Sequence, residues 1–147
     1  MRILVPSLEN SSENYRLCLH DRDFALGSMI VDNIVHCIDK SRRVIIVLSQ
    51  HFVKSKWCQW ELDMANHKSF EDSSCFLILI QLEILERRAL PRHLKLLMDT
   101  RTYLEWPDKK EAETNTDVVF KRLKDAMGPS IRQVEHTTTT LSIEASA

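Results

Sequence analysis

Short apolar runs alternate along the chain with segments whose apolar residues recur every three or four positions. Val44–Leu48 and Cys75–Ile80 are apolar throughout, which is typical of strands that are covered on both faces of a sheet. Tyr15–His20 alternates and predicts a further strand, and Thr102–Trp106 predicts a weaker one. Helical spacing predicts helices over 30–40, about 55–69 and 90–98, and a last one through Met127 that Gly128 and Pro129 end.

Strands that alternate with helices predict an α/β fold, in which a parallel sheet carries helices on both faces. A chain of 147 residues is long enough to bury one core and too short for two domains. We expect the domain to span residues 1–128. The tail over 129–147 contains four consecutive threonines and has no periodicity, so we expect it to be disordered.

Composition excludes several classes of function. The chain has two glycines, Gly27 and Gly128, which are too few for a Walker loop or a dinucleotide-binding glycine loop. With 20 Lys and Arg against 21 Asp and Glu, the net charge of -1 offers no basic surface for nucleic acid. The longest apolar run, Cys75–Ile80, is far below the roughly 20 residues that insertion into a bilayer requires. Single cysteines and unpatterned histidines predict reduced thiols and no metal site.

Three sequence segments, LCLHDRDF at 17–24, FVKSKWCQWEL at 52–62 and TYLEWP at 102–107, resemble the Toll/interleukin-1 receptor (TIR) domain. The likeness is closest to the cytoplasmic domain of Toll-like receptors and covers about Leu4 to Met127. It implies a flavodoxin-like parallel sheet and a structural motif that comprises Trp57, Cys58, Trp60, Leu62, Tyr103, Leu104, Trp106 and Phe120.

The resemblance also implies a function. TIR domains associate with other TIR domains, of receptors or adaptors, and thereby start innate immune signalling. This implies a non-enzymatic interaction module without a cofactor, able to form homo-oligomers. It implies a place in the cytoplasm, or on the cytoplasmic side of a membrane receptor whose span is not in this chain.

The chain departs from the family pattern at its start. The family opens with a buried strand that carries a (Phe/Tyr)-Asp-Ala-Phe motif, which this chain lacks, and Ile3–Glu9 resembles the end of the following helix. We therefore expect four strands, with a strand over Arg2–Val5 as the alternative. In the family the absent strand lies between those at Tyr15–His20 and Val44–Leu48. Their inner edges should lack partners or close onto each other, which lowers stability and favours capture of a foreign strand.

The segment RDFALG at 22–27 is the expected partner-binding loop, because it follows a strand at the edge where open α/β sheets bind ligands. In the plainer interpretation Phe24 packs beneath the loop and its charges are solvated, but the resemblance favours partner binding. Leu26 stands where the family has a proline that influences the choice of adaptor. The loop residues proposed to bind are Arg22, Asp23, Phe24, Ala25, Leu26 and Gly27.

Glu61 is the candidate for an alternative, enzymatic function. TIR domains that cleave NAD use a glutamate at the matching position to stabilise the positive charge that forms as nicotinamide leaves. In the plainer interpretation Glu61 pairs with a nearby cation, while Trp57 and Trp60 fill the contact between helix and sheet. We favour the plainer interpretation, because Toll-like receptor members of the family generally work as scaffolds.

Overall fold

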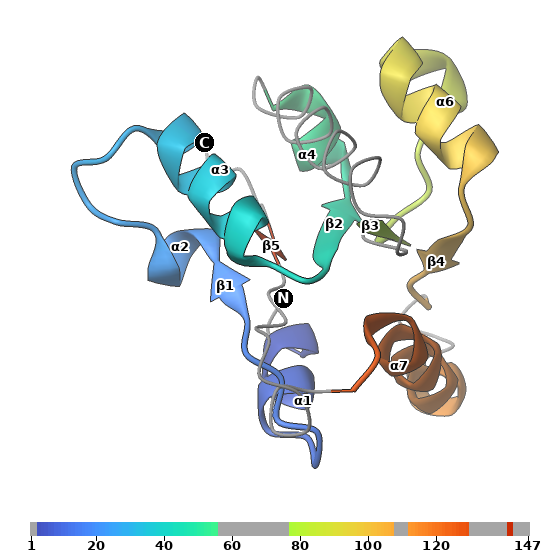
Figure 1. The fold of residues 1–147 in the computed structure, drawn as a ribbon. Helices are drawn as coiled ribbons and strands as arrows, with labels where there is room; N and C mark the ends of the chain where they lie inside the picture. The colour runs from blue at the N-terminus through green and yellow to red at the C-terminus, as the bar shows by residue number, and fades with distance from the viewer. Residues whose placement is uncertain (1–2, 56–76, 108–111, 130–140, 143–147) are drawn as a thin grey trace.

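The computed structural model describes residues 3–55, 77–107, 112–129 and 141–142 (Figure 1). Three strands, β2 (Val44–Leu48), β3 (Leu77–Gln81) and β4 (Tyr103–Glu105), form a parallel sheet in the order β2-β3-β4. A second parallel pair joins β1 (Cys18–Leu19) to β5 (Leu141–Ser142). The parallel α/β class predicted from the sequence is confirmed.

Helices connect these strands in the order that the apolar spacing predicts. The helix expected over 30–40 is α3, with the same bounds, and Met29 precedes its first turn. The helix expected from residue 90 begins two residues later, and the one expected over about 55–69 lies outside the described residues. The helices are α1 (Leu4–Glu9), α2 (His20–Asp23), α3 (Ile30–Lys40), α4 (Gln50–Lys54), the 3-10 helix η1 (Arg87–Ala89), α6 (Arg92–Thr100) and α7 (Ala112–Met127).

The sheet divides the core into two layers, because successive side chains of a strand point to opposite faces. On one face, Ile46 and Leu48 of β2 pack with side chains of α3, α4 and α6. On the other face, Ile45 and Val47 pack with side chains of α1 and α7. Figure 1 shows α3, α4 and α6 on one side of the strands and α1 and α7 on the other. The helices thus cover both faces, as predicted.

The segment before β1 is helical and is fastened to α7. Leu4 and Leu8 of α1 are buried in the same layer as α7, which supports the helical interpretation of this segment over a strand. The Tyr15 hydroxyl donates a 2.8 Å hydrogen bond to the carbonyl of Gly128. Lys124 of α7 donates a 2.9 Å hydrogen bond to the Glu13 carboxylate. These contacts hold residues far apart in the sequence on one face of the sheet.

The strand β1 is shorter than the prediction of Tyr15–His20. Only Cys18 and Leu19 are in strand conformation, because the chain turns into α2 directly afterwards. In the described residues β1 pairs with β5 and not with β2. The two edges therefore do not close onto each other, and Leu141–Ser142, within the tail predicted to be disordered, forms the strand beside β1.

The ion pair between Glu13 and Lys124 generates a prediction about pH. The hydrogen bond from Lys124 lowers the pKa of Glu13 from 4.5 to about 2. A pKa that is lowered by folding stabilises the fold above the unfolded pKa, and this contribution is lost as the pH falls from 4.5 to about 2. Lys124→Ala should raise the pKa of Glu13 towards 4.5, whereas Lys124→Arg should keep it low. Carboxyl NMR titration measures this pKa, and an unchanged value in Lys124→Ala would contradict the assignment.

Candidate functional site

The segment from α2 to the start of α3 holds the predicted partner-binding loop. Arg22 fixes its base, since its Nη1 and Nη2 atoms donate to the two Glu9 carboxylate oxygens at 3.1 and 2.8 Å. The same guanidinium donates to the carbonyl of Leu17 at 2.8 Å and, through Nε, to Asp23 at 3.1 Å. A bidentate pair of this kind fixes the orientation of the guanidinium relative to the carboxylate as well as their separation. Arg22 therefore joins α1, the strand region and α2 at one point.

Asp23 closes the turn on the other side of Arg22. Its Oδ2 atom accepts a 2.7 Å hydrogen bond from the backbone N–H of Leu19 in β1. Partial burial raises the pKa of Asp23, but the hydrogen bonds from Arg22 and Leu19 outweigh it and lower the pKa overall. Asp23 is therefore a carboxylate at neutral pH and holds the chain in the turn after β1.

Asn33 of α3 clamps the far end of the loop, which the sequence analysis missed. Its Oδ1 atom accepts from the N–H of Ala25 at 3.0 Å, and its Nδ2 atom donates to the carbonyl of Ala25 at 3.2 Å. The same amide nitrogen lies 3.4 Å from the carbonyl of Met29. A side-chain amide can satisfy a backbone donor and acceptor together. The signal that could have found it is an asparagine in the first turn of the helix that follows the loop.

The tip of the loop carries exposed apolar side chains. Leu26 is exposed to 102%, Met29 to 70% and Ile30 to 41%. Phe24 is half-buried and packs against the core layer that contains α3. Gly27 has a φ of +81°, which favours glycine, and open space lies where a Cβ would be. The structure thus separates an anchored base from an apolar tip, which we define as Leu26, Met29 and Ile30.

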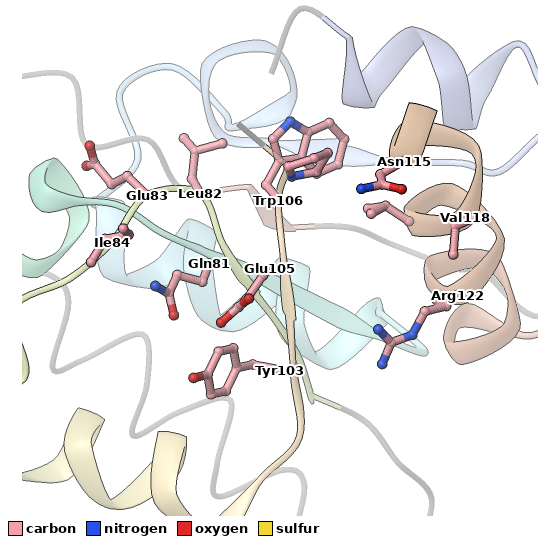
Figure 2. A pocket seen from close by; sticks show the side chains of 12 residues that line it. Gln81, Leu82, Glu83, Ile84, Tyr103, Glu105, Trp106, Asn115, Val118 and Arg122 are labelled. Atoms are coloured by element: carbon pink, nitrogen blue, oxygen red, sulfur yellow. The ribbon is translucent and has the colours of Figure 1, made fainter. Parts of the chain in front are cut away.

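A second feature is a cavity of about 930 Å³ at the carboxyl ends of β3 and β4 (Figure 2). Figure 2 shows Gln81 and Glu105 from the strand ends and Arg122 from α7 around it. The Gln81 Oε1 atom is buried and has no hydrogen-bond partner among the described residues. The lining of the cavity contains one cation, Arg122, and two carboxylates, Glu83 and Glu105. It therefore selects neither an anionic nor a cationic ligand.

The predicted structural motif is partly visible beside this cavity. The rings of Trp106 and Phe120 meet edge to face, with centroids 5.5 Å apart and an interplanar angle of 88°. Leu104 is buried and Tyr103 is half-buried on β4. These contacts hold α7 against the end of β4. The other motif residues, Trp57, Cys58, Trp60 and Leu62, and the enzymatic candidate Glu61, lie outside the described residues.

Two of the four cysteines are neighbours in the core. The sulfur atoms of Cys18 and Cys37 lie 2.6 Å apart, and both residues are free thiols. Burial and the neighbouring Cys37 raise the pKa of Cys18, so it is a protonated thiol at neutral pH. Cys37 is buried and Cys18 is half-buried, and both belong to the core layer that contains α3.

Comparisons with known proteins agree with this architecture. The sequence model of the TIR domain matches residues 1–142. The chain belongs to the TIR family. It is 48% identical to Toll-like receptor 2 of Canis lupus familiaris over 108 residues, which are 71% of this chain and 14% of that protein. It is 42% identical to Toll-like receptor 2 type-2 of Gallus gallus over 128 residues, 85% of this chain and 16% of that protein.

A solved structure shares the fold. The chain is 27% identical to a metazoan TIR-STING receptor from C. gigas, solved in complex with 2',3'-cGAMP, with a TM-score of 0.62. The match covers 87% of this chain and 36% of that one. The chain spans about one-sixth or less of the length of the Toll-like receptors named above. Within the described residues, every helix is too short or too polar to traverse a bilayer.

The clamp by Asn33 generates a prediction about loop order. Asn33→Ala removes both hydrogen bonds to Ala25, so hydrogen exchange at the Ala25 amide should accelerate about tenfold. Asn33→Asp keeps an acceptor for the Ala25 N–H and serves as the matched control, with exchange close to that of the parent. Exchange read by NMR checks both variants. Equal acceleration in Asn33→Ala and Asn33→Asp, or none in either, would contradict the clamp.

Proposed function

We propose that this domain acts by associating with other TIR domains through the loop that carries the apolar tip. Membership in the TIR family and similarity to Toll-like receptor 2 support an interaction module of innate immune signalling. The partners are TIR domains of receptors or adaptors, including further copies of this chain. The proposed location is the cytoplasm or the cytoplasmic side of a receptor.

The observation that carries the proposal is the exposure of Leu26 and Met29 on an anchored loop. Apolar side chains that face water gain free energy when a partner covers them. The hydrogen bonds of Arg22 and Asn33 already order the loop, so binding loses less conformational entropy than it would with a free loop. In this assignment Leu26 and Met29 contact the partner. Arg22, Asp23 and Asn33 position the loop.

The remaining loop residues shape this surface. Phe24 packs against the core layer that contains α3, and the loop residues after it are exposed. Ala25 receives the clamp from Asn33 through its backbone, and Gly27 supplies the turn with positive φ. Leu26 has no ring to fix its φ, unlike the family's proline. It presents a freely rotating apolar side chain instead. We therefore expect the identity of residue 26 to influence which TIR domain binds.

Leu26→Asp and Met29→Asp should each weaken association at least about tenfold, which corresponds to about 1.4 kcal/mol. Both side chains are exposed, so the melting temperature should change little. Leu96→Asp is the matched control, because Leu96 is exposed to 63% on α6, away from the loop. The dissociation constant is measured by isothermal titration calorimetry, in which this chain is titrated in excess into a purified TIR domain. If Leu96→Asp weakens binding as much as Leu26→Asp does, the loop is not the binding surface.

The alternative function, NAD cleavage with Glu61 at its centre, has a direct test. We expect no nicotinamide release above background when the purified chain is incubated with NAD and the products are separated by chromatography. The reason is the family's scaffold role in Toll-like receptors, together with a glycine-poor sequence that offers no phosphate-binding loop. Release by the parent that Glu61→Gln abolishes would contradict the non-enzymatic assignment.

A further inference from the structure

The strand β2 is buried on both faces and lies at the end of its hydrogen-bonded sheet. All five residues of Val44–Leu48 are buried. Within the described residues β2 pairs with β3 alone, so its other edge has no ladder partner in that sheet. Buried backbone N–H and C=O groups are almost always paired, because an unpaired one loses its hydrogen bonds to water without replacement. The inner edge of β2 therefore requires another backbone.

A strand, β5, lies beside this edge. The segment β5 pairs in parallel with β1, with Leu141 in register with Cys18 and Ser142 in register with Leu19. It also contacts β2. Figure 1 shows β5 between β1 and β2. Cys18 packs with the layer of α3 and Leu19 with the layer of α1 and α7, so β1 continues the same two layers as β2.

We propose that the space between β1 and β2 is a strand-binding site that recognises an extended backbone, and that the C-terminal segment centred on Leu141 and Ser142 is its occupant. This inference goes beyond the proposed association through the loop and does not depend on it. Binding by addition of a strand relies on main-chain hydrogen bonds, with side chains adding selectivity.

The composition of the tail suits such an occupant. Between Glu135 and Glu144 the sequence has no Asp, Glu, Lys, Arg, Gly or Pro, and it contains four consecutive threonines followed by Leu141. Threonine and isoleucine favour extended backbone, and an uncharged segment can enter a space between two buried layers without desolvating a charge. The connection from Met127 at the end of α7 to Leu141 exceeds the roughly dozen residues that a parallel crossover requires.

The pairing is short, which makes the occupant exchangeable. Two residue pairs join β5 to β1. A strand held by so few pairs detaches locally, and the free energy of this opening is a small fraction of the free energy of global unfolding. A peptide with the sequence of residues 136–147, added in trans, should therefore enter the site when the covalent tail is prevented from doing so.

The test compares two full-length variants. Leu141→Pro with Ser142→Pro removes two backbone N–H groups and excludes the segment from a strand interior. Leu141→Val with Ser142→Thr is the matched control, which keeps the backbone and its β propensity. Hydrogen exchange at Cys18 and at the inner edge of β2 should accelerate at least about tenfold in the proline variant only. The 136–147 peptide should restore protection in that variant.

The outcomes that overturn the proposal are distinct. Unchanged exchange in the proline variant means that the tail does not occupy the site. Failure of the peptide to restore protection means that the site does not recognise the segment. Protection in the parent that rises with protein concentration assigns the occupant to a second copy, which replaces the intramolecular assignment.

A second measurement covers the case in which the proline variant does not fold. Register partners in a sheet lie within the Cα separation that a disulfide spans. In a Cys37→Ser background, Leu141→Cys should cross-link to Cys18 when oxidised glutathione accepts the two electrons, and peptide mapping should find that disulfide. Ser142→Cys is the control, because Ser142 is in register with Leu19. Equal cross-linking of the two variants, or none in Leu141→Cys, overturns the assigned register.

Discussion

The burial of β2 on both faces is the constraint on which the rest of the structure depends. Side chains that alternate between two apolar layers require helices on each side of the sheet, and these helices are α3, α4 and α6 on one face and α1 and α7 on the other. The same burial requires a backbone partner at each edge of β2. Within the described residues β3 meets this requirement at one edge, and β5, which pairs with β1, contacts β2.

The two layers also determine where the loop stands. Its base is tied to α1 on one face through Arg22 and Glu9, and its far end is tied to α3 on the other face through Asn33. A segment held from both layers can project an apolar tip into water without losing its conformation. Exposure of Leu26 therefore carries information about binding, whereas an isolated exposed leucine elsewhere would not.

The sequence predicted the elements whose signal is local and missed those that depend on tertiary contacts. The apolar run Val44–Leu48 and the helical spacing over 30–40 correspond to β2 and α3. A strand buried on both faces is apolar at every position, whereas a helix buried on one stripe is apolar at every third or fourth position. The loop was located by its motif, but its clamp by Asn33 requires knowledge of where α3 packs. The strand at Leu141 was missed because a threonine-rich tail has no period of its own.

The short strand β1 connects the loop at residues 22–27 to the space beside β2. Leu19 donates its N–H to Asp23 at the base of the loop, and the same residue is in register with Ser142 of β5. The carbonyl of Leu17, two residues earlier, accepts from Arg22. A two-residue strand has few hydrogen bonds of its own, so the strand on one side and the turn on the other jointly define its position. Because both depend on the backbone of β1, the strand that fills the space beside β2 also supports the loop that projects from the domain.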